Sequence, residues 1–570
     1  MCKLKLPLFL QCLVFLIPVN YFVIGNGTGS GIQWALFKYQ QDIFGNNFYS
    51  VTTVIFNLTS GFLSPHRALA AGLWIFGSSL LIGSFCLHVL AIQKKKPEFQ
   101  KYAAIITFSS GIIYLISDIF HYGLLCQSPE SYCIPVGIPV ILVIGILGYR
   151  FAGRENCWDF KIAENPRFPH LNPLILLIFI SVFVKIIVFS VSMFPAIVWV
   201  HQDVNLYFSY ANSALSGEIP YIDYMIEYPQ FFLIPVFIAQ IPTLVLQNPA
   251  VSFHSFMILM YLFDTATLVC VYLIAHRLFG QKKALLCGLL YATAFAPAFY
   301  VALTYDSVPT FLLMLSVLMF VYGKEIPAYI SASIGFLSKW FPVFCFPVYI
   351  LYTLKNKKET LALKKGLVIS FIIIALSIIP FIILNYNSFL KTYLFHFGRE
   401  AYNPSLIYYL DVISKHFFDI GPFVNISLIL LIFAESFLIY WYYTHLDGKE
   451  VTMCYVLLLS IFCFILLNKV FAPYYIVWIL PLLALFFTNS YRQIILFYLV
   501  QLVFYFEEPI LMERVVNNYS IIGESWVMNP LIFHPFVFYS IKFMVLFVVL
   551  YVIIRNLCMT QITKKEADTE

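Results

Sequence analysis

Long apolar runs alternate with short polar segments along almost the whole chain. The runs are continuous and rich in Leu, Ile and Phe, which is typical of membrane-spanning helices; spanning strands would alternate apolar and polar residues over about ten positions. A first block of four helices is predicted at about residues 7–25, 67–92, 102–125 and 134–150. We therefore expect an all-α polytopic integral membrane protein.

A polar stretch on the inner side, residues 157–172, separates this block from the rest of the chain. Such a stretch favours a domain boundary, with a four-helix membrane module at 1–160 and a larger helical membrane domain at 161–570. In the second domain helices are predicted at about residues 173–195, 252–276, 284–301, 309–324, 366–386, 421–443, 451–467, 472–488, 493–506 and 532–555.

Three further apolar segments are not expected to cross the membrane fully. If residues 229–248 crossed, the basic end of the next helix would lie outside, so we interpret this proline-containing segment as interfacial or re-entrant. The helices predicted at 327–338 and 340–354 are short for a span of ~30 Å. They predict a shallow hairpin with Lys339 at its tip.

Composition agrees with a membrane protein, because 61% of the 570 residues are hydrophobic and 11% are charged. The net charge of +6 comes from basic residues in short loops, which mark the inner side and do not indicate a nucleic-acid partner. Lys3 and Lys5 place the N-terminus inside, and the first apolar run has no clear cleavage site. We expect a multi-pass protein of the cell membrane with both termini in the cytoplasm.

The first block holds two candidate features. None of the twelve cysteines has zinc-site spacing, but Cys126 and Cys133 bracket a loop predicted outside, where a disulfide and two unpaired thiols are both open alternatives. Asp118 and His121 on the third helix mark either a second site or a hydrogen-bonded pair between helices.

Residues 201–230 form a polar island between very hydrophobic segments. The island carries Asp203, Glu218, Asp223 and Glu227. Because the chain has few charges, four acids at one membrane edge indicate a site for a polar substrate beside lipid.

The predicted topology brings further charged residues to the same outer side. They are Asp306, Lys339, His396, Arg399 and Lys469. Carboxylates together with cations suit group transfer from a phosphate, since one carboxylate deprotonates an acceptor hydroxyl while cations meet the charge on the leaving phosphate. A phosphate leaves without a strong general acid, unlike the alkoxide in glycoside hydrolysis.

Several segments resemble the GT-C glycosyltransferases, integral-membrane enzymes that use polyprenyl-phosphate sugars. The island is similar to their first external loop, and NKVFAPYYIVWILPLL at 468–483 is similar to their late lysine motif. Between these two, three segments resemble the family's intermediate motifs in the expected order: TYDSVP, FLSKWFPVFCFP and FHFGREAYNPSLIYYL. The resemblance covers residues 165–560 and is nearest to the GPI mannosyltransferase catalytic subunit and to archaeal and bacterial mannosyltransferase-like proteins.

This resemblance implies a GT-C-like bundle of about 12 helices with a large first external loop. It also implies inverting transfer of a hexose, with mannose favoured, from a polyprenyl or dolichyl phosphate to a lipid-linked, protein-linked or cell-surface glycan. Asp203 would be the catalytic acidic residue. The partners that the resemblance suggests are membrane lipid, the lipid-linked donor, the glycan acceptor and a small membrane subunit.

Substrate or phosphate binding is expected of Lys339, His396, Arg399, Lys469, Asp223, Glu227 and Asp306. Most have a simpler alternative: Asp203 as a helix cap, Asp223 and Glu227 as solvated loop residues, and the cations as headgroup contacts or interfacial anchors.

Two departures from the family pattern bear on function. The Asp-x-Asp of eukaryotic relatives is Asp203-Val204-Asn205 here, and Asn is a poorer ligand for a hard cation, so we expect no metal and leave dependence on a divalent cation open. The family's late glutamine is Tyr474. The alternative functions are a membrane transporter or lipid flippase, and a non-catalytic subunit with the GT-C fold. Transporters are often built from internal repeats, and because the sequence shows none, the enzyme is favoured.

Overall fold

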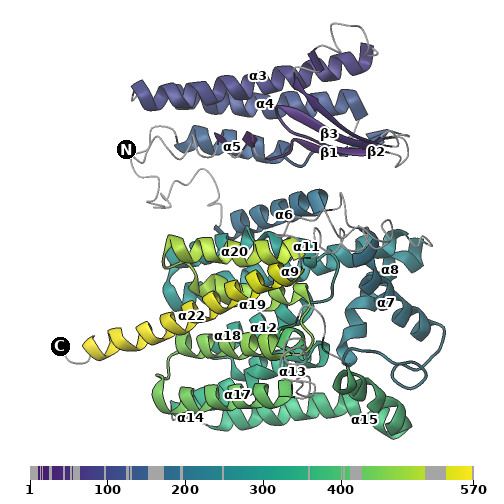
Figure 1. The fold of residues 1–570 in the computed structure, drawn as a ribbon, viewed down its shortest axis with the longest axis vertical. Helices are drawn as coiled ribbons and strands as arrows, with labels where there is room; N and C mark the ends of the chain where they lie inside the picture. The colour runs from purple at the N-terminus through teal and green to yellow at the C-terminus, as the bar shows by residue number, and fades with distance from the viewer. Residues whose placement is uncertain are drawn as a thin grey trace. The chain divides into compact units, whose positions relative to one another are not determined.

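The computed structural model divides the chain into two compact units, Met1–His170 and Leu171–Glu570 (Figure 1). The residues that it describes are 11–12, 14–15, 17–24, 29–42, 45–51, 54–55, 65–94, 98–122, 127–128, 131–151, 173–192, 197–246, 250–356, 360–399, 401, 405–410, 426–507 and 535–567. This part is mainly helical, as expected, and seven of its helices are long and apolar enough to cross a membrane. The predicted boundary at 160 lies outside the described residues.

The described part of unit 1 contains three helices that correspond to three of the four predicted for the first block, two of them long and one short. They are α3 (Pro65–Lys94), α4 (Glu98–Tyr122) and α5 (Ile138–Phe151), and α4 packs against both others. Asp118 accepts a hydrogen bond of 2.5 Å from the side chain of Asn20, while His121 contacts the Tyr122 ring. Cys126 lies outside the described residues.

Unit 1 also contains an antiparallel sheet that the all-α expectation did not include. Its strands are β1 (Asn20–Ile24), β2 (Gly29–Gln33), β3 (Phe37–Asp42), β4 (Gly45–Ser50), β5 (Gln127–Ser128) and β6 (Ser131–Ile134), in the order β4-β3-β2-β1-β6-β5.

The first predicted helix was wrong in its second half, because the chain is a strand from Asn20 onward. The sequence NYFVI is as apolar as the segment before it, so an apolar run hides the change, but its aromatic and β-branched residues favour a strand. β1 pairs with both β2 and β6. The chain that follows the first predicted helix and the loop that contains Cys133 therefore meet in one sheet.

Unit 2 is a helical bundle (Figure 1). Its helices are α6 (Pro173–Ser192), α7 (Ile197–Leu215), η4 (Gln230–Phe232), α8 (Leu233–Leu246), α9 (Ala250–Phe279), α10 (Gln281–Ala292), α11 (Phe295–Tyr300), α12 (Ser307–Val321), α13 (Glu325–Ser338), η5 (Phe341–Phe344), α14 (Cys345–Lys355), α15 (Thr360–Gly398), α17 (Ile426–His445), α18 (Glu450–Leu467), η7 (Pro473–Tyr475), α19 (Ile476–Phe486), α20 (Tyr491–Phe506) and α22 (Pro535–Ala567).

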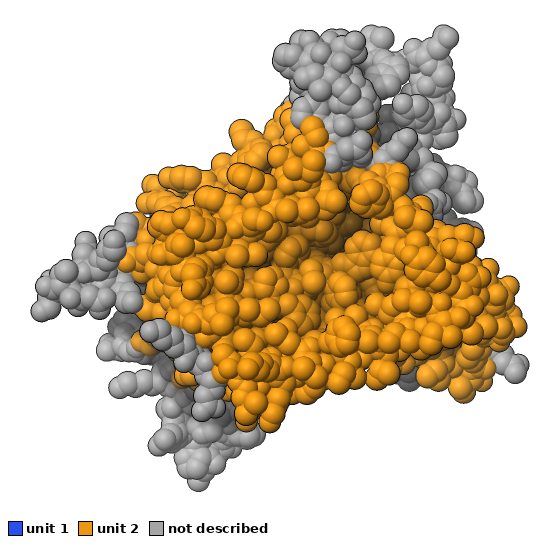
Figure 2. Space-filling view, turned by 90° about the horizontal axis from the view of Figure 1, so that it is seen from below, with its two compact units in different colours: residues 1–170 blue, residues 171–570 orange. Residues whose placement is uncertain are grey.

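Burial separates the centre of this bundle from its periphery. Every residue of α19 is buried, and this helix packs against α9, α10, α12, α18 and α20. In contrast, Phe371 on α15 and Phe433 on α17 are 73% and 72% exposed. Large apolar side chains exposed along whole helices are typical of a lipid-facing surface. Seen from the side of α15 and α17, the surface of unit 2 is hollowed near its centre (Figure 2).

Buried ion pairs join several of the apolar helices. Lys185 on α6 pairs with Asp264 on α9 at 2.8 Å, and the Tyr291 hydroxyl of α10 donates to Asp264 at 2.6 Å. Lys542 on α22 pairs with Glu507, at the end of α20, also at 2.8 Å. Because their charges are paired and hydrogen-bonded, these groups have a structural explanation.

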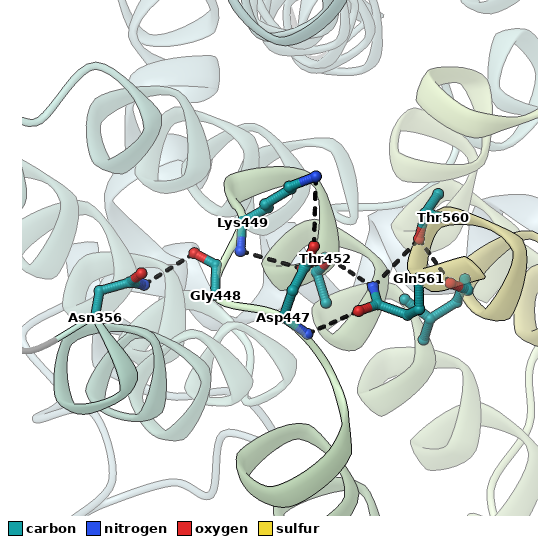
Figure 3. Close-up of polar contacts among 8 residues, drawn as sticks. Asn356, Asp447, Gly448, Lys449, Thr452, Thr560 and Gln561 are labelled. Atoms are coloured by element: carbon teal, nitrogen blue, oxygen red, sulfur yellow. Dashed lines mark hydrogen bonds and ion pairs between the residues drawn. The ribbon is translucent and has the colours of Figure 1, made fainter. Parts of the chain in front are cut away.

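A polar network ties α14, α18 and α22 together (Figure 3). The Gln561 side chain of α22 accepts from the backbone N–H of Asp447 and donates to Thr452. Asn356 donates to the Gly448 carbonyl from the end of α14. The short connection between α17 and α18 is thereby fixed from both sides.

Candidate functional site

Asp203 lies on α7, whose packing determines where its carboxyl points. Val204, Tyr207 and Ala211 are almost fully buried and share one face of this helix at the helical period. Asp203 is one turn before Tyr207 and therefore lies at the edge of the buried face, half-buried itself. An apolar face thus holds a carboxylate beside the interior of unit 2.

The environment of Asp203 makes its carboxylate a stronger base. Burial raises the pKa of the Asp203 carboxyl above that of an exposed aspartate, the positive charges of Lys339 and Arg399 lower it, and the negative charges of Asp306 and Glu227 raise it. The raised pKa is the net result. A basic carboxylate among these four charges is suited to accepting a proton.

Asp306 and Lys339 form the centre of the site. Lys339 Nζ donates to Asp306 Oδ1 at 2.6 Å, and Trp478 Nε1 donates to the same oxygen. Asp306 precedes α12, Lys339 follows α13 in extended backbone, and Trp478 is on α19. Three segments that are far apart in the sequence are therefore joined through one fully buried carboxylate.

Aromatic rings surround the Lys339 ammonium. Its nitrogen lies 5.6, 5.2, 5.4 and 5.1 Å from the ring centroids of Tyr228, Tyr474, Tyr475 and Trp478, respectively. Ring faces attract a cation and exclude water, so the ammonium is held in place. The Tyr228 hydroxyl is 3.3 Å from that of Tyr207, which links this group to α7 and Asp203.

The end of the polar island is a strap, residues 219–229, that α15 holds in place. The strap includes Tyr221 with a φ of 66°, an unusual value for a residue other than glycine, and its hydroxyl donates to the Tyr228 carbonyl at 2.8 Å. Thr392 donates to the Ile226 carbonyl at 2.9 Å, and His396 Nε2 lies 2.6 Å from the Glu227 carbonyl. Both contacts come from the last turns of α15.

A kink in α15 brings those turns to the strap. Asn385 interrupts the helix with φ −160° and ψ 96°. Its side-chain oxygen accepts from the backbone N–H of Ser388 at 3.1 Å and so caps the second half of the helix. The helix can therefore change direction before it presents His396 and Arg399.

Two more cations lie at the open edge of the site. Arg399 is 3.7 Å from the Glu227 carboxylate, and both side chains are partly exposed, so the pair is weak. Lys469 donates to the Phe397 carbonyl at 2.7 Å. Burial and the neighbouring Arg399 charge lower the pKa of Lys469.

The predicted site residues separate into two groups. Asp203, Glu227, Asp306, Lys339, His396, Arg399 and Lys469 come together through the contacts above. Asp223 does not join them: it is exposed, and its carboxylate accepts from the Ile219 backbone N–H at 2.7 Å in a local turn.

Asp306 was expected to bind substrate, and that role stays a prediction; in the structure its carboxylate is buried against Lys339. Tyr207 and Tyr228 were missed, although the dense tyrosines of the island were a usable signal. Within the described ranges no cluster of three or more His, Cys, Asp or Glu side chains is arranged to hold a metal ion.

Comparison with protein-family models and with curated proteins finds no match for the chain. What the site can do therefore follows from its own side chains. They provide one basic carboxylate, a fixed ammonium in an aromatic surround, and two partly exposed cations.

Proposed function

We propose that the protein is an integral-membrane glycosyltransferase of GT-C type, which transfers a hexose, with mannose favoured, from a polyprenyl or dolichyl phosphate to a glycan acceptor at the outer face. The observation that carries the proposal is the half-buried Asp203 carboxyl, whose pKa is raised, near the cations Lys339 and Arg399 from two other segments. Transfer from a phosphate needs a basic carboxylate for the acceptor proton and fixed positive charges for the leaving phosphate.

In this mechanism Asp203 removes the proton from an acceptor hydroxyl. The acceptor oxygen forms a bond to C1 of the sugar while the bond from C1 to the phosphate oxygen breaks, and its electron pair leaves with the phosphate. Attack from the face opposite the phosphate inverts the configuration at C1. The proton remains on Asp203 until it passes to solvent.

The cations have different roles in this step. Both Arg399 and Lys469 are partly exposed. Among the described residues the only ion pair of Arg399 is the weak one with Glu227, and Lys469 contacts the Phe397 carbonyl, so both are available to the phosphate oxygens. Lys339 is already paired with Asp306, so it contributes a fixed positive charge that is partly neutralised. Asp306 and the four aromatic rings keep that charge in place before the substrate binds.

The proposal is tested with purified full-length protein in liposomes and a short-chain polyprenyl phosphate that carries radiolabelled mannose, with extracted membrane glycans as acceptors. We expect labelled glycan, release of polyprenyl phosphate in equal amount, and inversion at C1. Movement of the labelled lipid across the bilayer with its sugar–phosphate bond intact would instead show a flippase.

A further inference from the structure

Side chains hold three consecutive carbonyls of the strap, those of residues 226, 227 and 228. Thr392 and His396 of α15 hold the first two, and the Tyr221 hydroxyl donates to the third at 2.8 Å. These three residues lie outside helices and strands, so their carbonyls have no partners of that kind and depend on side chains. Of the three side chains, Tyr221 is the one that belongs to the strap itself.

The backbone of Tyr221 is strained. Its φ of 66° is a value that glycine and asparagine adopt more readily than tyrosine. Such strain persists where the surrounding structure imposes it, and it is concentrated at functional sites. The side chain explains why a tyrosine stands here, because its ring is buried and its hydroxyl reaches the carbonyl of Tyr228, seven residues further on. Glycine or asparagine would relieve the strain but could not make these two contacts.

The ring of Tyr221 packs against α15 on both sides of its kink. Its centroid lies 5.0 Å from that of Phe381 and 6.1 Å from that of Phe389, both in edge-on contacts. These two phenylalanines precede and follow Asn385, and their own rings are stacked at 6.0 Å. Edge-on and stacked rings have preferred orientations. The kinked form of α15 therefore determines where the Tyr221 hydroxyl lies.

Tyr228, which accepts from that hydroxyl, forms part of the wall around Lys339. Its ring stacks on Phe232 at 4.3 Å, and the Lys339 ammonium lies 5.6 Å from the Tyr228 centroid. Its hydroxyl is 3.3 Å from that of Tyr207, one turn after Asp203. A hydrogen bond that fixes the Tyr228 backbone therefore fixes a ring beside both charged groups of the site.

We propose that Tyr221 is a positioning residue for the transfer reaction: through the Tyr228 carbonyl it sets the ring that faces Lys339. This inference rests on the proposed glycosyl transfer. Arg399, which is expected to contact the donor phosphate, follows the end of α15, so Tyr221 couples the helix next to that contact to the placement of the Lys339 charge. A charge that is already in place lowers the barrier of the chemical step more than it strengthens donor binding.

The test is the kinetics of Tyr221→Phe in the full-length protein, with the polyprenyl phosphate that carries radiolabelled mannose as donor. Phenylalanine keeps the ring against α15 and removes the hydroxyl, so the Tyr228 carbonyl loses its donor. We expect kcat to fall about 3- to 10-fold, the worth of one hydrogen bond. KM for the donor should change less than about twofold, because the cations that are expected to meet the phosphate are unaltered.

Tyr224→Phe is the matched control. The Tyr224 hydroxyl is in the same strap and donates to the Tyr210 carbonyl of α7 at 2.7 Å, so this variant loses a bond of the same kind. The two variants should therefore melt at about the same temperature. Tyr224→Phe should keep the kcat of wild type, because the Tyr228 carbonyl retains its donor.

A double-mutant cycle with Tyr228→Leu tests the path of the effect. If Tyr221 acts through the Tyr228 ring, Tyr221→Phe should lower kcat no further once that ring is removed. Effects that multiply overturn the inference, as does wild-type kcat in Tyr221→Phe or a melting temperature far below that of Tyr224→Phe. If wild type itself transfers no sugar, the proposed function fails, and the inference fails with it.

Discussion

Asp306 and Lys339 depend on each other because both charges are removed from water. Asp306→Asn leaves the ammonium in an aromatic surround without its counter-ion. Breaking a buried pair in this way costs about 3–5 kcal/mol, and since Lys339 is 14% exposed we expect the lower end. Chemical denaturation of the purified protein measures the loss.

Adding Lys339→Met to Asp306→Asn provides the control. The double variant has no unpaired charge, so it should recover most of the lost stability while sugar transfer stays below that of wild type. A single variant as stable as wild type would show that water already solvates Lys339 in the folded protein.

The raised pKa of Asp203 predicts the pH dependence of transfer. The carboxyl acts as a base only when it is ionised, so activity should decline as the pH falls through its pKa, at a higher pH than for an exposed aspartate. The profile of kcat/KM against pH measures this limb. Asp306→Asn removes a negative charge that raises the Asp203 pKa, so any residual activity should decline at a lower pH than in wild type. A decline at the same pH as in wild type would show that another group is the one that titrates.

Among the single residues of the site, the sequence revealed the charged ones better than the neutral ones. Asp203, Lys339 and Arg399 stood out because charges are rare in an apolar chain. The pairing of Asp306 with Lys339 and Trp478 depends on three segments meeting, and nothing in local sequence specifies it. Tyr228, a neutral residue whose ring lies over Lys339, was missed.

Among the elements, α15 links the apolar bundle to the site. Asn385→Ala removes the cap from its second half, which costs about 1 kcal/mol, and favours a straight helix that carries His396 away from the strap. We expect KM for the lipid donor to rise more than kcat falls. Asn385→Ser keeps a capping oxygen and should stay near wild type; equal kinetics for the two variants would contradict this role.

Hydrophobic pattern predicted most of the long helices but not the elements that shape the site. The helices flanking Lys339 were expected, and α13 and α14 confirm them. The extension of α15 to Gly398 was not, because its second half carries polar residues typical of a loop. The sheet of unit 1 was missed because short strands give weak signals beside long apolar runs.

For the whole molecule, the positive-inside rule assigns α7 to the outer face and the start of α15 to the inner face. Ser209→Cys on α7 and Lys364→Cys on α15 each place a thiol at an exposed position. In intact cells a membrane-impermeant maleimide should label Ser209→Cys above the parent protein, and Lys364→Cys only after permeabilisation. The opposite pattern would place the site on the cytoplasmic face.

The most direct test of the whole account is sugar transfer by Asp203→Asn. The asparagine keeps the shape of the side chain but cannot take the proton, so turnover should fall about 10²- to 10⁴-fold. Since burial raises the pKa of this carboxyl, the ionised form costs the folded state stability at neutral pH, and the variant should melt no lower than wild type. A stable, inactive Asp203→Asn protein is the predicted result; normal transfer by it would contradict the account.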